Sequence, residues 1–305
     1  MIRFGIQILN YNGSRWMPGI LDSLENCSYP EKRVYIVDNG STDDSLQIAR
    51  DSELPLEVIE NGSNFGFAGA YNQSANAAWR DDCDWLCLLN TDILVCPGWL
   101  ENVAEVVEEN ERIGIAGPVH WAWDEDTPSP FMRRRYPEEL EQLLTGAEHI
   151  SVDWIEGSCL FVSRACWESV KGLDARYFFY WEDADLCRRA RKNGWLVELV
   201  ANSHIRHYGG GSSAALEAVA NPLKQRYHFL YKLSDPNHGM LSNFGSWLRM
   251  LITIGGDILV RPGRLRRLWI TLANVGWTVC HAGMIFRKWR GDKIASVAST
   301  QKNQT

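Results

Sequence analysis

The stretch WLCLLNTD, residues 85–92, decides the fold that we expect for this chain. Its first five residues are apolar, which is typical of a buried strand, and it ends in the polar tip Asn90-Thr91-Asp92. In an open α/β sheet, ligands bind at the carboxyl ends of the strands. A buried carboxylate there needs a compensating cation or donor, and Mg²⁺ carrying a diphosphate would supply one. The alternative is that Asp92 only caps a turn before Pro97.

Strand and helix patterns alternate through the N-terminal part of the chain, with short connections between them. This alternation predicts an α/β fold with a mostly parallel central sheet flanked by helices. The predicted strands are 2–9, 34–37, 56–59, 84–89, 113–116, 152–162 and 195–200. The predicted helices are one with Trp16, Ile20, Leu21 and Leu24 on one face, one capped by Ser41 or Thr42, and others over 70–79, after Pro97, over 164–171 and over 182–193.

Regularity fails between residues 121 and 150. Residues 124–130 form a polar stretch that contains prolines, and three arginines follow at 133–135. We expect this segment to be a mobile excursion over one face of the site.

The chain changes character from about residue 213, where long helical patterns appear without strands. Leu268–Phe286 contains no charged residue, but Thr271, Asn274 and Thr278 give it a polar stripe, and basic residues flank both ends. A polar stripe favours an amphipathic helix at a membrane surface, or packing within the molecule or a homodimer, over a membrane span.

Composition excludes some classes of function and compartment. The 305 residues carry a formal net charge of −7, which argues against a general nucleic-acid binder. The eight cysteines show no CxxC pair and no zinc-binding spacing. The first dozen residues alternate like a strand and show no secretory signal, so we expect a cytoplasmic protein.

Two further acidic positions follow predicted strands or open predicted helices. Asp38 ends the second strand, where it can contact a pyrimidine base or a ribose, or simply form an Asx turn with Asn39 and Gly40. Glu182 and Asp183 open a helix directly after an aromatic run. The helix dipole stabilises such acids, but a partly desolvated carboxylate there is also a competent general base. Asp183 and Asp185 should point in different directions.

Two glycine-rich segments have contrasting readings. His204–Ser213 places histidines beside three glycines, a pattern that suits close approach to a diphosphate, and only one of His204 and His207 should face the site. Asn64–Ala70 is glycine-rich but lacks the P-loop lysine and does not follow the first strand. Neither an NTPase nor a nicotinamide-dependent dehydrogenase is supported.

Five ordered motifs together resemble a known family. They are DNGSTDDS from Asp38, NFGFAGAYN at 64–72, NTD at 90–92, GSCLFVSR at 157–164 and FYWEDADLCR at 179–188. The chain resembles the family 2 glycosyltransferases of GT-A fold, a Rossmann-like architecture, and especially their rhamnosyltransferase-like branch. The resemblance covers residues 1–232 and leaves 233–305 as a helical C-terminal extension.

The resemblance implies an inverting transfer from a nucleoside-diphosphate sugar. It makes Asp183 the base that deprotonates the acceptor hydroxyl, with Glu182 orienting it, and places Mg²⁺ or Mn²⁺ on Asp92 with His207 beside it. Asp38 would contact the nucleobase of the donor. The other residues that it assigns to the nucleotide sugar are Asn10, Asn12, Asn64, Gly66, Asn90, Thr91, Gly157 and Arg188.

One residue departs from the family pattern. The family's metal motif often begins with Asp, where this chain has Asn90. A neutral first residue leaves Asp92 as the only strong ligand of the motif, so we expect weak metal binding that depends on bound nucleotide.

The resulting hypothesis is a bacterial sugar transferase for cell-surface polysaccharide, with dTDP-rhamnose as first donor and a saccharide or lipid-linked acceptor. UDP- and GDP-sugars stay open as donors. A nucleotidyltransferase is an alternative, although Asn10–Gly13 is not the basic loop that such enzymes use. A non-catalytic nucleotide-sugar-binding protein is another, against which the retained Asp92, Glu182 and Asp183 speak. The tail suggests attachment to the inner face of the cell membrane.

Overall fold

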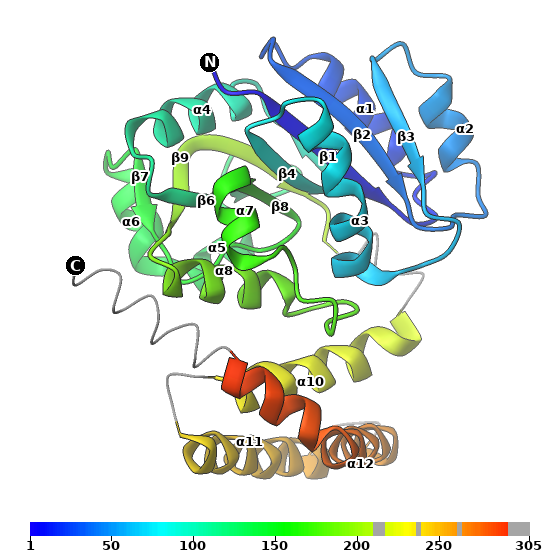
Figure 1. Cartoon of the computed structure of the whole chain (residues 1–305), viewed down its shortest axis with the longest axis vertical. Coiled ribbons are helices and arrows are strands. Elements are labelled where there is room, and N and C mark those ends of the chain that lie inside the picture. Colours follow the sequence, from blue (N-terminus) through cyan, green and yellow to red (C-terminus); the bar gives the residue numbers. More distant parts are fainter. Residues whose placement is uncertain (210–216, 236–238, 261–263, 292–305) are drawn as a thin grey trace. The chain divides into compact units, whose positions relative to one another are not determined.

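The computed structural model describes residues 1–209, 217–235, 239–260 and 264–291, which fall into two compact units (Figure 1). The first unit contains residues 1–178 and 182–216, and the second contains 179–181 and 217–305. The expected boundary at 232/233 therefore falls at the end of α10 (Glu217–Leu233), a helix of the second unit. The glycine-rich residues 210–213 lie outside the described residues.

The first unit is built on a nine-stranded mixed sheet in the order β3-β2-β1-β4-β8-β6-β9-β5, with β7 paired to β9. Its N-terminal half is parallel, because β1 pairs in parallel with β2 and β4, and β2 with β3. β8 runs antiparallel between β4 and β6, and β9 is parallel to β6. The strands are β1 Phe4–Asn10, β2 Lys32–Asp38, β3 Leu56–Glu60, β4 Trp85–Asn90, β5 Ile93–Val95, β6 Ile113–Trp121, β7 His149–Ser151, β8 Cys159–Ser163 and β9 Leu196–His207.

Helices cover both faces of this sheet, as Figure 1 shows. On one face, α1 and α4 pack their apolar residues against alternate residues of the strands, such as Ile6, Ile8 and Leu89, to form the main core. On the other face, α3 packs against β1. There the buried Gln7 side chain donates to the carbonyl of Ser74 and accepts from its hydroxyl. The helices are α1 Met17–Glu25, α2 Ser45–Arg50, α3 Gly66–Arg80, α4 Trp99–Glu109, α5 Pro130–Arg135, α6 Pro137–Leu144, α7 Arg164–Val170 and α8 Glu182–Lys192.

The segment 121–150 differs from the expected irregular excursion. It contains α5, α6 and β7, in addition to the polar loop. The hydroxyl of Ser129 accepts a hydrogen bond from the backbone N–H of Met132 and so caps α5, whose first residue is Pro130. Met132, together with Leu140 and Leu143 of α6, is buried, so apolar contacts hold these short helices in place. The expectation that the whole segment is irregular was therefore wrong.

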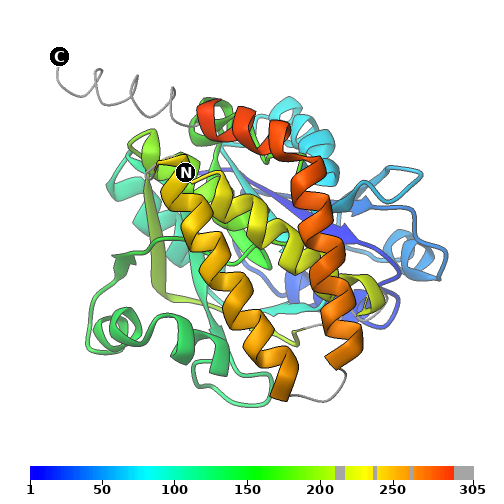
Figure 2. The ribbon, with the colours of Figure 1, turned by 90° about the horizontal axis from the view of Figure 1, so that it is seen from below.

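The second unit consists of α10, α11 (Met240–Val260) and α12 (Arg264–Cys280), which pack side by side (Figure 2). The three residues 179–181 belong to this unit because Trp181 stacks on His228 of α10, with ring centroids 4.3 Å apart and planes 1° from parallel. The indole N–H of Trp181 also donates to the carbonyl of Lys224, at 3.1 Å.

The polar stripe of α12 faces inward. Asn274 is 1% exposed and accepts a hydrogen bond from Nε of Arg226 on α10. Apolar residues of the same helix are exposed instead, with Trp269 at 71% and Val279 at 67%. Among the described residues, no helix is both long enough and apolar enough to cross a membrane.

Candidate functional site

Polar residues gather at one edge of the sheet, at the carboxyl ends of its parallel strands. Register pairs Asn10 at the end of β1 with Asp38 at the end of β2, and Leu9 with Asn90 of β4. β8 is antiparallel, so its first residue, Cys159, stands opposite Leu89 at the same edge. The carboxyl ends of β6 and β9 reach this edge too, and there register pairs His120 with Ile205.

The carboxylate of Asp38 forms an Asx turn. Its Oδ2 accepts hydrogen bonds from the backbone N–H groups of Gly40 (3.1 Å) and Ser41 (3.0 Å), and its Oδ1 accepts from the amide of Asn10 (2.9 Å). Asp38 is 2% exposed and Asn10 is fully buried. Both residues therefore shape the loop after β2, and the contact of Asp38 with a base stays a prediction.

The same loop corrects the expected cap of α2. The residue that precedes this helix is Asp44, and neither Ser41 nor Thr42 caps it. The Ser41 hydroxyl instead accepts from the backbone N–H of Asn12 (2.9 Å), and Asn12 Oδ1 accepts from the N–H of Thr42 (2.8 Å). The φ of Asn12 is +54°, a left-handed conformation that Asn tolerates better than most residues. These bonds join the loops after β1 and β2.

The NFG segment is fastened to two other loops. Asn64 Oδ1 accepts from the Asn39 amide and from the N–H of Gly66, both at 2.9 Å. The next residue, Phe67, donates its N–H to the carbonyl of Phe178 at 2.7 Å. Gly66 has a φ of +72°, and a Cβ built there would lie 2.2 Å from that carbonyl oxygen. Only glycine fits this position, which ties the start of α3 to the segment before α8.

The NTD tip is largely buried at this edge of the sheet. Asp92 is 1% exposed and Thr91 is 2% exposed. Asn90 donates its backbone N–H to the carbonyl of Ser158 at 2.9 Å, so the tip lies alongside the segment that leads into β8.

His207, the last residue of β9, stands between two carboxylates. Its Nε2 lies 3.6 Å from Asp92 Oδ1, and its Nδ1 lies 3.7 Å from Glu156 Oε2. Burial disfavours the charged imidazole, but the two carboxylates outweigh burial and raise the pKa of His207 to about 10. Asp92 and His207 thus lie together, as the sequence predicted. A buried carboxylate beside an imidazole is a donor set that fits a divalent ion.

Sequence reasoning missed two residues of this site, His120 and Glu156. Glu156 Oε2 lies 3.5 Å from Nδ1 of His120, which is 3% exposed near the end of β6. Burial lowers the pKa of His120 to about 4. Burial would raise the pKa of Glu156, but His207, His120 and the Ser158 hydroxyl reverse that effect and hold it at about 2. The signal for His120 was lost because β6 was predicted to end at Ala116.

Asp183 and Glu182 open α8 beside the same segment. The backbone N–H of Gly157 donates to Asp183 Oδ2 (2.9 Å), and the N–H of Ala184 donates to Oδ1 (2.7 Å). Burial raises the pKa of Asp183 to about 6 against the effect of these hydrogen bonds. Glu182 is 4% exposed, its Oε2 has no hydrogen-bond partner among the described residues, and burial raises its pKa well above the ordinary value, with the charge of Asp183 adding to the effect.

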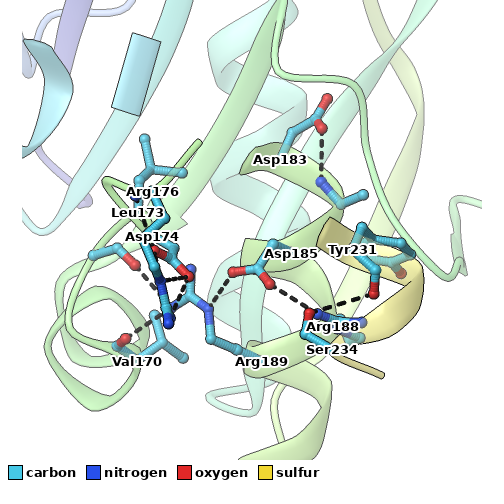
Figure 3. A network of polar contacts seen from close by, with 12 residues as sticks. Val170, Leu173, Asp174, Arg176, Asp183, Asp185, Arg188, Arg189, Tyr231 and Ser234 are labelled. Atoms are coloured by element: carbon cyan, nitrogen blue, oxygen red, sulfur yellow. Dashed lines mark hydrogen bonds and ion pairs between the residues drawn. The ribbon is translucent and has the colours of Figure 1, made fainter. Parts of the chain in front are cut away.

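The remaining acid of this helix has a different environment. Asp185 is fully buried and pairs with Arg188 (2.9 Å) and Arg189 (2.7 Å), as Figure 3 shows. Arg189 also donates to the carbonyls of Val170 and Gly172, so this network anchors α8 on the end of α7. Asp183 lies apart from the network, in agreement with the predicted divergence of the two aspartates. Arg188 is buried in an ion pair, and its contact with nucleotide sugar stays a prediction.

The backbone just before Glu182 is strained. Tyr180 and Trp181 have φ values of +76° and +74°. Consecutive bulky residues in the left-handed region are rare, and such strain collects at functional sites.

Comparison with known proteins identifies the architecture. The model of the family "Glycosyl transferase family 2" matches residues 6–166, which include the NTD tip. The chain belongs to glycosyl transferase family 2. The expected GT-A fold is confirmed by solved structures, among them a mannosyltransferase of Pyrobaculum calidifontis in complex with GDP-Man and Mn²⁺. That likeness has a TM-score of 0.58 at 16% identity and covers 99% of this chain and 87% of that one.

Two curated relatives of this family 2 glycosyltransferase are rhamnosyltransferases. The N-acetylglucosaminyl-diphospho-decaprenol L-rhamnosyltransferase of Mycobacterium tuberculosis is 28% identical over 85% of this chain and 93% of its own length. Rhamnosyltransferase WbbL of Escherichia coli is 32% identical over 78% of this chain and 97% of its own length. The rhamnosyltransferase-like character predicted from the motifs is thereby confirmed, and the protein is a glycosyltransferase of polysaccharide synthesis.

Proposed function

We propose that this protein transfers rhamnose from dTDP-rhamnose, with inversion, to a hydroxyl of a sugar that is attached to a polyprenyl diphosphate. Its rhamnosyltransferase relatives support the choice of sugar, and the Mycobacterium tuberculosis relative supports a lipid-linked N-acetylglucosamine as acceptor. UDP- and GDP-sugars are the alternative donors.

One observation carries the proposal: the consecutive residues Glu156 and Gly157 connect the proposed general base, Asp183, to the proposed metal ligand His207. Glu156 faces His207, and Gly157 donates its N–H to Asp183. The groups that bind a diphosphate and the group that accepts a proton are therefore held by the same short segment. This is the arrangement that a sugar transfer needs, because leaving group and acceptor lie on opposite sides of one carbon atom.

In the proposed reaction, the acceptor oxygen bonds to the anomeric carbon as the bond from that carbon to the diphosphate oxygen breaks. The acceptor proton passes to the carboxylate of Asp183, whose half-buried position and two backbone hydrogen bonds fix its orientation. Glu182 precedes Asp183 at the start of α8, and the charge of Asp183 adds to the burial that raises the pKa of Glu182. The leaving group is the nucleoside diphosphate.

Asp92 and His207 would hold Mg²⁺ or Mn²⁺ at the diphosphate. When bound, this ion neutralises negative charge on the departing diphosphate as a Lewis acid. Asn10, Asn12, Asn64 and Gly66 contribute by fixing the loops around the nucleotide, as their hydrogen bonds to neighbouring loops indicate.

The apolar surface of the second unit supports a peripheral contact with the cytoplasmic face of a membrane. Exposed apolar side chains on α11 and α12 include Leu241 (87%), Ile252 (67%) and Trp269 (71%). Apolar helix faces of this kind insert into the headgroup region of lipid bilayers, where a polyprenyl acceptor would also lie. A homodimer through this surface is the competing explanation, and sedimentation with and without vesicles separates the two.

A panel of dTDP-, UDP- and GDP-sugars, with synthetic N-acetylglucosamine diphosphate lipid as acceptor, tests the function. We expect transfer with dTDP-rhamnose and an inverted linkage by NMR. In the Asp183→Asn variant, transfer should fall by about 10²–10⁴-fold while donor binding persists in calorimetry. Unchanged turnover in this variant would exclude Asp183 as the base, and donor binding without transfer by the wild type would favour the non-catalytic alternative.

A further inference from the structure

Three donor side chains converge at the sheet edge, and the resemblance to family 2 glycosyltransferases accounts for only one of them. They are His120, Glu156 and His207, here called the His–Glu–His cluster. His120 comes from β6, Glu156 from the segment before β8, and His207 from the end of β9. Each offers one ligand atom, and these three atoms all lie within 4.8 Å of one another.

The spacing of the three atoms is close to that of ligands around one ion. Glu156 Oε2 lies 3.5 Å from His120 Nδ1 and 3.7 Å from His207 Nδ1. Two ligands that each bind a metal at about 2.0–2.2 Å lie about 3.0–3.6 Å apart, depending on geometry. Side-chain rotations that shorten the longest of these separations would therefore bring the cluster onto an ion.

Burial gives the cluster a fixed framework. The side chain of His120 is 4% exposed, that of His207 15% and that of Glu156 31%. The Ser158 hydroxyl donates to Glu156 Oε2 at 3.1 Å and so fixes the carboxylate.

Glu156 is also linked to the NTD tip, where this chain has the neutral Asn90. The backbone N–H of Asn90 donates to the carbonyl of Ser158, and the hydroxyl of Ser158 donates to Glu156, so hydrogen bonds through Ser158 link the two segments. Asp92 lies 3.6 Å from the Nε2 atom of the same His207 ring. The two carboxylates thus face different nitrogen atoms of His207, with Asp92 at Nε2 and Glu156 at Nδ1.

We propose that the His–Glu–His cluster binds a divalent transition-metal ion without any help from nucleotide. The assignment of this ion to the diphosphate rests on the proposed function, but its binding does not. Two imidazoles and a carboxylate favour Mn²⁺, Co²⁺ or Zn²⁺ over Mg²⁺, which prefers oxygen ligands. This proposal is an alternative to the expected weak, nucleotide-dependent binding by Asp92.

Titration of the metal-stripped, full-length protein with Mn²⁺ alone, followed by electron paramagnetic resonance, tests this inference. We expect saturable binding with no sugar nucleotide present, and at least about tenfold weaker competition by Mg²⁺. Glu156→Gln should weaken Mn²⁺ binding by at least about tenfold. The matched control is Glu168→Gln, an equal change at an exposed residue of α7 that pairs only with Arg164 among the described residues, and it should bind like the wild type.

Two further variants keep the test decisive if Glu156→Gln folds poorly. Asn90→Asp/Glu156→Gln should recover part of the lost affinity, because it returns a carboxylate to the same edge. His120→Gln should remove one of two imidazole couplings in the spin-echo spectrum of bound Cu²⁺, a signature that a structural role for His120 would leave unchanged.

The wild type binding no Mn²⁺ without nucleotide would overturn the inference, as would a Glu156→Gln variant that folds and binds like the wild type. Either result leaves the proposed function intact, since sugar transfer is measured separately. Conversely, metal binding without transfer of any sugar would refute the proposed function and leave the cluster as a metal site.

Discussion

The backbone N–H of Gly157 donates a 2.9 Å hydrogen bond to Oδ2 of Asp183, and no side chain lies between them because residue 157 has none. A Cβ at this position would lie 3.1 Å from the ring of Phe67 and 3.3 Å from Cβ of Asp183. These separations are tight but not prohibitive. The glycine therefore allows Asp183, the proposed general base, to contact the segment that carries Glu156 directly.

Gly157→Ala should reduce transfer more than it reduces stability. The added methyl group must displace Asp183 by a few tenths of an ångström, and small misplacements of a catalytic group are costly in rate, up to about 10²-fold. We expect a lower kcat, nearly unchanged KM for the donor and an unfolding free energy within about 1.5 kcal/mol of the wild type. Steady-state kinetics and urea denaturation measure the two effects. A variant with full kcat would show that the position of Asp183 is not critical.

Transfer should rise with pH through about 6. Burial raises the pKa of Asp183 to about 6, and only the ionised carboxylate can accept the acceptor proton. Below that pKa the carboxyl group is protonated and the rate should fall about tenfold per pH unit. A pH profile of kcat/KM with saturating metal measures this limb. The residual activity of Asp183→Asn is the control, and it should lack the limb.

Glu182→Gln should stabilise the fold at alkaline pH. Glu182 is buried, and its pKa in the folded protein lies well above the ordinary 4.5 of the unfolded chain. Its protonated form favours folding below that unfolded value, and this contribution is lost as pH rises toward the folded pKa. As the pH rises from about 5 to about 8, the unfolding free energy of the variant should therefore increase by about 1–3 kcal/mol relative to that of the wild type. Denaturation at both values, with Glu168→Gln as control, checks the sign. An equal gain at both would contradict it.

Alanine substitutions at two glycines distinguish the cost of backbone strain from the cost of a steric clash. Gly66 and Gly62 have nearly equal φ values of +72° and +70°, but a Cβ at Gly66 would lie 2.2 Å from the Phe178 carbonyl, whereas at Gly62 nothing lies within 4 Å. Gly62→Ala should cost about 1 kcal/mol, the price of the left-handed conformation alone. Gly66→Ala should cost at least about 2 kcal/mol more, because the bond from Phe67 to Phe178 is also lost. Equal costs would show that the start of α3 can move away freely.

The sequence predicted the α/β architecture well where local pattern decides it. The apolar run before Asn90 and the alternation around β1 and β2 placed the strands within a few residues. Strand ends that rest on long-range pairing were missed. β6 and β9 extend to Trp121 and His207 because they pair with each other in parallel, a contact that no local pattern reveals.

The site follows the same division. Asp92, Asp183 and His207 lie at strand or helix ends that motifs mark, and their grouping at one sheet edge agrees with the prediction. Glu156 and His120 were missed because their role comes from a contact between segments 36 residues apart in sequence. The Asx turn of Asp38 was one of two alternatives, and burial favours it.

Residues 179–181 belong to the helical unit, although Phe178 and Glu182, their neighbours in the sequence, belong to the first unit. Trp181 rests on His228 and bonds to Lys224, and the next two residues are the acids of the proposed base. A chimera that exchanges the C-terminal helices with those of a relative must therefore exchange three residues in the middle of the chain as well. Transplanting residues 217–305 alone would replace or remove the ring that Trp181 stacks on, immediately before Glu182 and the proposed base Asp183.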